Sequence, residues 1–248
     1  MCRDCGCGDK EIVPVEVHQR ILSENDAHAR HNREHFEEHG VVSINLMGSP
    51  GSGKTALLEA TSRLAGSRLR FSAVSGDLAT DRDGERLRRA GIPASTITTG
   101  SACHLDARMV HDALHDLPLE GLDAFFIENV GNLVCPAIYD LGQTASVVAL
   151  SVTEGEDKPL KYPHMFRAAD LMLLNKIDLL PHVRFDTARC VADARLANPR
   201  LGVVEVSATR GDGLVGWYEW LRERVAALDV PAGGAGLSGP RTAARSHT

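Results

Sequence analysis

The chain has 248 residues, of which 43% are hydrophobic and 24% are charged, a composition typical of a soluble globular protein. Its 27 Lys and Arg against 33 Asp and Glu give a net charge of −6, which disfavours a broad surface for nucleic acid or for an anionic membrane. The sequence has no apolar run near the about 20 residues that a membrane span needs and no apolar signal region at its N-terminus, so we expect a cytoplasmic protein with reduced cysteines.

Three of the six cysteines lie within the first seven residues, at Cys2, Cys5 and Cys7, with glycines beside them. Thiols this close together can enclose one soft metal ion, and nickel, zinc and copper(I) all suit such ligands. A redox role without metal is the alternative. Residues 1–17 are too few for a core of their own, so we expect a flexible metal-binding head.

A mostly charged helix is expected over residues 18–39. Its histidines His28, His31, His35 and His39 recur at spacings of three and four, which places them on one helix face. That face is either a metal-storage surface or a solvated polar face, and the second is the commoner arrangement.

Short apolar runs alternate with amphipathic stretches from residue 41 onward. The expected strands are residues 41–47, 71–76, 95–98, 124–130, 147–152, 171–175 and 203–207. The expected helices between and after them are residues 54–65, 83–90, 106–117, 187–197 and 214–228. This alternation predicts a doubly wound, mainly parallel α/β sheet of about seven strands flanked by helices. We assign residues 18–229 to this domain and expect a disordered tail over 230–248, which is rich in Ala, Gly and Ser.

The first expected strand is followed by residues 48–55, which match G-x-x-x-x-G-K-[ST] and open a helix. Glycines let the backbone N–H groups surround a phosphate, and the helix N-terminus adds its positive end. Lys54 is expected to reach the β- and γ-phosphates, and the Thr55 hydroxyl to hold Mg²⁺. The residues predicted to bind phosphate are Gly48, Gly51, Ser52, Gly53, Lys54, Thr55 and Ala56.

The base of the nucleotide is indicated by an N-K-x-D sequence at the end of strand 171–175. The carboxylate of Asp178 can accept hydrogen bonds from the N1–H and exocyclic amine of guanine, whereas adenine presents an unprotonated N1 there. Lys176 can lay its aliphatic stem along the base, beside Asn175. Ser207 and Ala208, at the end of the next strand, fit a further guanine contact, so we predict GTP as the substrate.

Acidic side chains follow two other expected strands, because Asp77 ends one and Glu128 lies near the end of another. Ligand-binding groups collect at the carboxyl ends of strands in open α/β sheets, so either carboxylate can join the Mg²⁺ shell, directly or through water. Gly131 can supply an N–H to the γ-phosphate and move after hydrolysis. With Lys54 these are the predicted catalytic residues, and Thr55 and Asp77 are the predicted magnesium ligands.

A second set of metal-ligating residues is split between two loops. Cys103 and His104 follow strand 95–98, and Cys135 follows strand 124–130, so both loops belong to the nucleotide edge of the sheet. Two thiolates and an imidazole converging there suit Zn²⁺ or Ni²⁺, and two ordinary loop cysteines are the alternative. Cys190 lies inside a helical pattern and is expected to be a small buried side chain.

Taken together, these motifs resemble one family, the hydrogenase nickel-incorporation GTPase HypB, which belongs to the SIMIBI class of P-loop GTPases. The stretches that carry the resemblance are the N-terminal C-x-x-C-G-C and residues 48–55, 100–106, 126–136, 151–163 and 175–178. They extend from Cys2 to about Arg224, which is nearly the whole chain.

The resemblance implies a nickel-binding metallochaperone that hydrolyses GTP while nickel is inserted into nickel–iron hydrogenase. It implies a nickel site at the three head cysteines and a second site, for nickel or zinc, at Cys103, His104 and Cys135 near a dimer interface. It also implies a homodimer that depends on GTP, and it implies as partners a nickel hydrogenase precursor and a second hydrogenase nickel-maturation protein. No nucleic acid or membrane partner is expected.

Two other functions remain open from the sequence. One is a urease-type nickel accessory GTPase with the same fold, although the cysteine head and residues 128–135 favour the hydrogenase family. The other is a metal buffer whose nucleotide site is only regulatory. Some relatives carry a long His-rich run after the cysteine head, whereas this chain has only the scattered histidines of residues 28–39.

Overall fold

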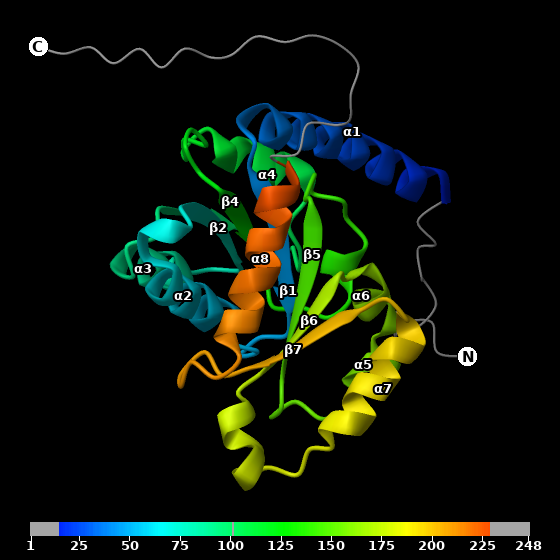
Figure 1. Ribbon diagram of the computed structural model, residues 1–248. Coiled ribbons are helices and arrows are strands. Elements are labelled where there is room, and N and C mark those ends of the chain that lie inside the picture. Colours follow the sequence, from blue (N-terminus) through cyan, green and yellow to red (C-terminus); the bar gives the residue numbers. More distant parts are fainter. Residues whose placement is uncertain (1–14, 101, 229–248) are drawn as a thin grey trace, which may run out of the picture.

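The computed structural model describes residues 15–100 and 102–228, so the cysteine head and the tail after residue 229 lie outside the described residues. Within this part, seven parallel strands form one sheet in the order β3-β2-β4-β1-β5-β6-β7 (Figure 1). The strands are β1 (Val42–Gly48), β2 (Phe71–Asp77), β3 (Ala94–Thr98), β4 (Ala124–Glu128), β5 (Ala145–Ser151), β6 (Leu171–Asn175) and β7 (Gly202–Val206). The predicted fold class is confirmed.

Helices connect the strands and cover both faces of the sheet. They are α1 (Val15–His39), α2 (Lys54–Ala65), α3 (Arg82–Arg89), α4 (Ala107–Leu114), α5 (Lys158–Lys161), α6 (Pro163–Ala168), α7 (Thr187–Ala197) and α8 (Leu214–Leu228). Short 3-10 turns are found at η1 (Gly66–Arg68), η2 (Cys135–Ala137) and η3 (Ile177–His182). Helices α2, α7 and α8 have the predicted bounds, and α1 begins three residues before the predicted residue 18.

Alternate residues of each central strand face opposite sides of the sheet, as the pleat requires. In β4, Phe126 packs in the core under α2, α3 and α8, whereas Phe125 and Ile127 face the core under α1 and α4. In β5, Val148 faces the core under α6 and α7. Because both faces of the central strands are buried, these strands are mostly apolar, and their carboxyl ends remain as the place for a polar site.

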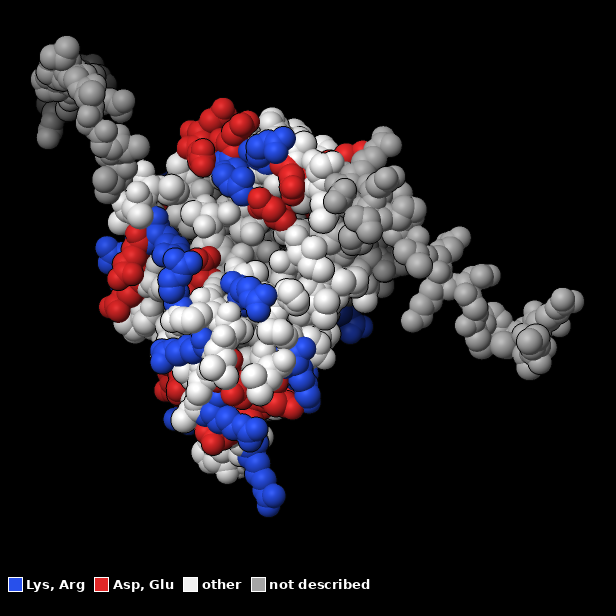
Figure 2. Space-filling view, turned by 90° about the vertical axis from the view of Figure 1, so that its right-hand side faces the viewer, with Lys and Arg blue, Asp and Glu red and all other residues white. Residues whose placement is uncertain are grey.

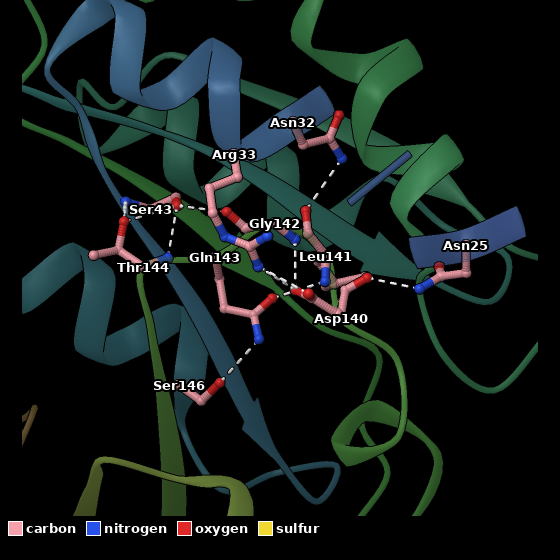
Figure 3. Close-up of polar contacts among 10 residues, drawn as sticks. All are labelled: Asn25, Asn32, Arg33, Ser43, Asp140, Leu141, Gly142, Gln143, Thr144 and Ser146. Carbon is pink, nitrogen blue, oxygen red and sulfur yellow. Dashed lines mark hydrogen bonds and ion pairs between the residues drawn. The ribbon is translucent and has the colours of Figure 1, made fainter. Parts of the chain in front are cut away.

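Helix α1 is fixed across the sheet by polar contacts to the loop between η2 and β5 (Figure 3). Arg33 donates both to Oδ1 of Asp140 at 3.0 Å and to Oδ2 at 2.8 Å, and the side-chain amide of Asn25 donates to the Asp140 carbonyl at 2.8 Å. Phe36 is buried against Phe125, with ring centroids 5.3 Å apart. The described part of α1 is therefore an integral layer of the domain.

Helix α8 packs against α2 on the opposite side of the sheet. The buried indole of Trp217 donates to the Thr61 hydroxyl at 2.9 Å, and Trp220 stacks on it with ring centroids 5.4 Å apart. This contact positions α2, the helix that follows the phosphate loop.

Basic and acidic side chains are interspersed on the face shown in Figure 2. Elsewhere among the described residues, surface ion pairs join Arg189 to Glu156 and Lys161 to Asp157. Among residues 15–100 and 102–228, no helix has both the length and the hydropathy that crossing a membrane requires.

Candidate functional site

A cavity of about 480 Å³ opens at the carboxyl ends of β1, β2 and β4, where open α/β sheets bind ligands. Its walls come from the phosphate loop (residues 48–55), the end of β2, helix α3, the segment after β4 and Lys176. They include seven residues predicted from the sequence in addition to the loop glycines, namely Lys54, Thr55, Ala56, Asp77, Glu128, Gly131 and Lys176.

The phosphate loop has the curled backbone that its glycines predict. Gly51 and Gly53 have φ of 78° and 95°, in the left-handed region that favours glycine. A Cβ atom on Gly53 would also collide with the side-chain amide of Asn175. Glycine is therefore needed at residue 53 both for its backbone conformation and for this close approach. Residue 54 then begins α2, whose N-terminus points its free N–H groups at the cavity.

Lys54 is buried, and its ammonium group contacts backbone carbonyl oxygens of the phosphate loop. Its Nζ donates to the carbonyl oxygens of Gly48 at 3.2 Å and Ser49 at 3.3 Å. Burial lowers the pKa of Lys54, while the nearby carboxylates of Glu128, Asp83 and Glu154 oppose this shift. A phosphate entering the cavity would supply the full opposite charge that these carbonyl dipoles only partly replace.

Glu128 is the most perturbed carboxyl group of the cavity. Its Oε1 accepts a hydrogen bond from the Thr55 hydroxyl at 2.7 Å, and its buried Oε2 has no hydrogen-bond partner. Burial raises the pKa of Glu128 to about 7, although Lys54 and Thr55 both act to lower it. A buried hydroxyl beside an unpartnered carboxyl oxygen fits a hard divalent cation such as Mg²⁺.

Asp77 provides a second acidic group at the end of β2. Its Oδ1 accepts from the backbone N–H groups of Ala79 at 2.9 Å and Thr80 at 2.7 Å. These bonds lower the pKa of Asp77 and keep its carboxylate charged in the cavity wall. The two acidic groups predicted for this site therefore have different environments, one polar and ionised, the other buried.

Two cavity residues on α3, Asp83 and Arg86, were not among the predicted site residues. The guanidinium of Arg86 pairs with Glu59 of α2 at 2.9 Å and with Asp83 at 3.3 Å. From the sequence, Asp81 and Asp83 are weaker candidates for acids near the γ-phosphate that can instead cap the next helix, and nothing in the sequence singles out Arg86. Asp81, at the N-cap position, bonds Thr96 and Arg88 and makes no side-chain cap bond.

The segment after β4 lies directly against the phosphate loop. Built as alanine, Gly131 would place its Cβ 2.8 Å from Pro50, so only glycine allows this approach. The backbone N–H of Asn132 donates to the Gly48 carbonyl at 3.1 Å. Gly131 thus lies where its backbone can respond to what the loop holds.

The residues predicted to read the base converge at the ends of β6 and β7. The Asn175 amide donates to the Ser52 carbonyl at 2.9 Å, and its oxygen accepts from the backbone N–H of Ala208 at 3.3 Å. Asp178 accepts from the Ser207 hydroxyl at 2.6 Å. Asn175 therefore ties the phosphate loop to the base-reading loop.

Lys176 lies across the phosphate loop, because its Nζ donates to the Gly51 carbonyl at 2.6 Å. Its φ of 63° is in the left-handed region, an unfavourable conformation for a non-glycine residue that turns the side chain back over the loop. The aliphatic stem is thereby placed beside the cavity, as expected for a residue that covers a base.

The second predicted metal site is brought together at the same edge of the sheet. The ligand atoms of Cys103, His104 and Cys135 all lie within 4.8 Å of one another, and the two sulfur atoms are 3.1 Å apart. The hydrogen bond with the Cys103 sulfur raises the pKa of Cys135, and burial and charge repulsion from Cys103 act in the same direction. Burial lowers the pKa of His104, whose ring stacks on Tyr139 with centroids 4.0 Å apart.

These ligands are chemically suited to a soft or borderline metal, since a divalent ion would offset the repulsion between the thiolates. The other predicted ligands, Cys2, Cys5 and Cys7, lie outside the described residues. Cys190 is buried as expected, and burial raises the pKa of its thiol to about 12, which makes it a poor ligand.

Residues 42–205 match the family model described as "CobW/HypB/UreG, nucleotide-binding domain". The hydrogenase maturation factor HypB of Rhizobium leguminosarum bv. viciae is 55% identical over 216 residues, which are 87% of this chain and 72% of that protein. This chain belongs to the HypB family. The resemblance expected from the motifs is thus confirmed, and with it a nucleotide-binding domain of the P-loop GTPase type.

Solved HypB structures share the fold of this HypB chain. The HypB of Archaeoglobus fulgidus is 44% identical, with a TM-score of 0.77 over 82% of this chain and 100% of that one. The HypB of Helicobacter pylori, solved in complex with nickel, is 38% identical, with a TM-score of 0.79 over 86% of this chain and 100% of that one.

Proposed function

We propose that the chain is a nickel-binding metallochaperone that hydrolyses GTP during nickel insertion into nickel–iron hydrogenase. The observation that carries this proposal is that one segment, residues 129–135, contacts both the phosphate loop and the Cys103–His104–Cys135 cluster. A nucleotide cavity and a transition-metal site with a shared wall are what a nucleotide-controlled metal carrier requires.

GTP binding is supported by the groups at the two ends of the site. The phosphate loop and Lys54 supply N–H groups and a cation for the phosphates. At the other end, Asp178 accepts a hydrogen bond from Ser207, and its carboxylate can also accept from the N1–H and the amine of guanine.

Hydrolysis is assigned to the groups that surround the γ-phosphate position. Lys54 would hold the charge that develops on the phosphoryl oxygens, and Gly131 would offer a backbone N–H. Mg²⁺, held by Thr55 with Asp77 and Glu128 close by, would supply neutralising charge across the β- and γ-phosphates. Glu128, with its pKa near 7, can hold or release a proton as its surroundings change.

Nickel is the cargo in this proposal. The cluster of Cys103, His104 and Cys135 offers two sulfur ligands and one imidazole, which suit nickel and also zinc. We assign the further nickel site to the head cysteines, Cys2, Cys5 and Cys7, in the segment 1–17. Free thiols need a reducing compartment, which supports the cytoplasm as the place of action.

A physical link connects the two sites. The side-chain amide of Asn132 donates to the Cys103 carbonyl at 3.1 Å, and its oxygen accepts from the Val134 N–H at 2.8 Å, next to Cys135. Its backbone N–H bonds Gly48 of the phosphate loop. A shift of the phosphate loop on hydrolysis would therefore move both metal-bearing loops, which lets nucleotide state bias metal affinity.

The partners in the proposal are a second copy of the chain, a nickel hydrogenase precursor and a second hydrogenase nickel-maturation protein. Val134 and Ile138, which flank Cys135, are large hydrophobic side chains about half exposed, at 47% and 52%. Apolar residues next to the metal site support an interface there in a homodimer formed with GTP.

The proposal is tested by the turnover of GTP by Lys54→Ala. Removing the ammonium group should abolish hydrolysis, and Lys161→Ala, which changes an exposed lysine on α5, should leave it intact. Full turnover by Lys54→Ala would overturn the assignment of the nucleotide site.

The alternatives give different results. A metal buffer with a regulatory nucleotide site would bind GTP without turnover, with or without nickel. A urease-type accessory protein would restore nickel loading of urease and not of hydrogenase in cells that lack the chain. Light scattering with a non-hydrolysable GTP analogue and with GDP tests the dimer, which should form only with the analogue.

A further inference from the structure

Histidines gather at a second place, between α1 and α4, apart from the Cys103 cluster. His31 lies on α1, His111 lies on α4, and His115 is the C-cap residue that directly follows α4. The ring of His111 contacts those of His31 and His115, so three imidazoles from two neighbouring elements lie side by side. The sequence placed the α1 histidines on one helix face but gave no indication of what that face contacts.

The spacing of the rings is that of imidazoles around a shared ion. The centroids of His31 and His111 are 4.8 Å apart, and those of His111 and His115 are 5.0 Å apart. Two imidazoles on one tetrahedral ion, each about 2 Å from it, have ring centroids about 5 Å apart. The rings meet at interplanar angles of 66° and 78°, so their edges can face a common point.

The ring of His111 is central to this group. Its Nδ1 is buried and has no hydrogen-bond partner, which is uncommon for a polar atom of this kind. The neighbouring imidazoles of His31, His115 and His28 help to lower the pKa of His111. The ring centroid of His28 is 6.4 Å from that of His111. His35 lies at the edge of this group: its ring contacts that of His39, and nearby His31 and His115 also help to lower its pKa.

The helices that carry the rings are held rigidly together. The Asn32 amide donates to the Ala107 carbonyl at 2.8 Å and to the Leu141 carbonyl at 3.1 Å, and Asn25 accepts from the Ala107 N–H at 2.9 Å. Figure 3 shows Asn25 and Asn32 reaching from α1 toward the loop around residues 140–142. Packing of the two helices therefore sets the distance between His31 and His111.

The protonation of the group favours a metal over protons. Burial lowers the pKa of His111 and of His35, and neighbouring imidazoles lower both further, while Asp112 and Glu38 act in the opposite direction. Neutral imidazoles at pH 7 offer lone pairs to a cation, and repulsion keeps several of them from being protonated at once. A single divalent ion can bind several neutral imidazoles at once, whereas protons would place a separate positive charge on each ring.

We propose that His111, His31 and His115 form a further metal site, an imidazole-only site between α1 and the C-terminal end of α4 that takes a borderline divalent ion such as Zn²⁺ or Ni²⁺. Among the described residues, only the Cys103 cluster already has three ligand atoms within 4.8 Å of one another. Metal binding at the histidines would therefore require the partly exposed rings to rotate about their side-chain torsions until their nitrogens face one point. Because the site lacks thiolates, it should favour soft ions such as copper(I) less than the cysteine sites do.

The test removes the thiolate ligands first. In a full-length variant with Cys2, Cys5, Cys7, Cys103 and Cys135 changed to Ser, equilibrium dialysis at pH 7.5 should still find one Zn²⁺ per chain. Zn²⁺ should also raise the melting temperature of this variant, since the ion binds only where the two helices are packed. Adding His31→Gln and His111→Gln should weaken Zn²⁺ binding by more than about tenfold and remove the shift in melting temperature.

The matched control is His164→Gln, which changes an exposed histidine on α6. It should leave both Zn²⁺ readouts unchanged. If the five-cysteine variant does not fold, the same comparison is made in the wild-type chain, where His31→Gln with His111→Gln should reduce the bound Zn²⁺ by one per chain. Unchanged stoichiometry, or an equal loss with His164→Gln, would show that these rings are only a solvated helix face.

Discussion

Single side chains in the nucleotide site divide into those that hold fixed charge and those whose charge depends on their surroundings. Asp77 is kept ionised by backbone N–H groups, whereas Glu128 is held neutral by burial up to about pH 7. The sequence predicted both residues from their positions at strand ends. It could not distinguish their environments, because burial arises from the packing of α2 and α3, which are distant in sequence from Glu128.

The buried carboxyl of Glu128 should make the nucleotide-free chain less stable as the pH rises. In the unfolded chain the group loses its proton near pH 4.5, and in the folded chain only near pH 7. The folded state therefore binds more protons between these values, and its stability falls as pH rises through them. Relative to Glu128→Gln, the wild type should lose about 2–3 kcal/mol of unfolding free energy between pH 5 and 8.

Urea denaturation of both chains at pH 5, 6, 7 and 8 measures this difference. A difference that stays constant over the series would contradict the raised pKa.

Asp178→Asn should change the base preference from guanine toward xanthine. The amide loses one of the two acceptors for guanine, and its new NH₂ donor faces the amine of guanine but suits the C2 carbonyl of xanthine. GTP affinity should fall by about one to two orders of magnitude, since a charge-assisted hydrogen bond is lost. Because the Ser207 hydroxyl can still donate to the remaining oxygen of residue 178, the local fold should be kept. Titration with a fluorescent nucleotide measures the GTP affinity. Retention of full GTP affinity would exclude Asp178 from base recognition.

At the scale of whole elements, the segment after β4 connects what the sequence shows as separate motifs. Its Asn129 oxygen accepts from the Leu105 N–H at 3.1 Å, and Asn132 joins the phosphate loop to Cys103. Two loops that leave neighbouring strands thereby share a support, which a list of motifs cannot reveal.

Asn132→Ala should uncouple the metal cluster from the nucleotide. The backbone bond to Gly48 remains, so GTP affinity should change by less than about threefold, but the support of Cys103 is lost. Nickel titrations with the GTP analogue and with GDP should give different affinities in the wild type and similar ones in the variant. Asn198→Ala, which removes an asparagine bonded to Phe166 and Ala169 on another face, serves as the control.

Elements with a strong period were predicted closely, and short ones were not. The α2, α7 and α8 patterns gave the observed bounds because each presents a continuous apolar stripe to the sheet. Helices α5 and α6 have four and six residues and begin around prolines, so no period is long enough to identify them. Strand β4 ends at Glu128, two residues before the predicted end, since Asn129 turns its side chain to Asn45 and Leu105.

For the molecule as a whole, the described residues form a hydrophobic core of their own. The sheet is buried on both faces and the α1 helix is fixed by Arg33 and Asn32. A metal site in residues 1–17 would therefore add a function without adding to the core, which is the arrangement expected for delivery of a cargo.

Replacing Cys2, Cys5 and Cys7 together by Ala should remove one bound nickel per chain. The melting temperature, the GTP turnover and the nickel or zinc bound at Cys103 and Cys135 should stay within error of the wild type. Metal analysis and turnover of the purified proteins test this, and in cells hydrogenase activity should fall and recover partly with added nickel. A drop in melting temperature or in turnover would mean that the head is part of the domain.

The contact between α8 and α2 allows nucleotide binding to be followed by tryptophan fluorescence. Both tryptophans of the chain are on α8, and the indole of Trp217 is bonded to Thr61, less than two turns after Lys54. Any movement of α2 when the phosphate loop fills changes the polarity around this indole, and with it the emission spectrum. Nucleotide arrival can thus be followed in real time by intrinsic fluorescence, with no dye attached near the cysteines proposed to bind metal.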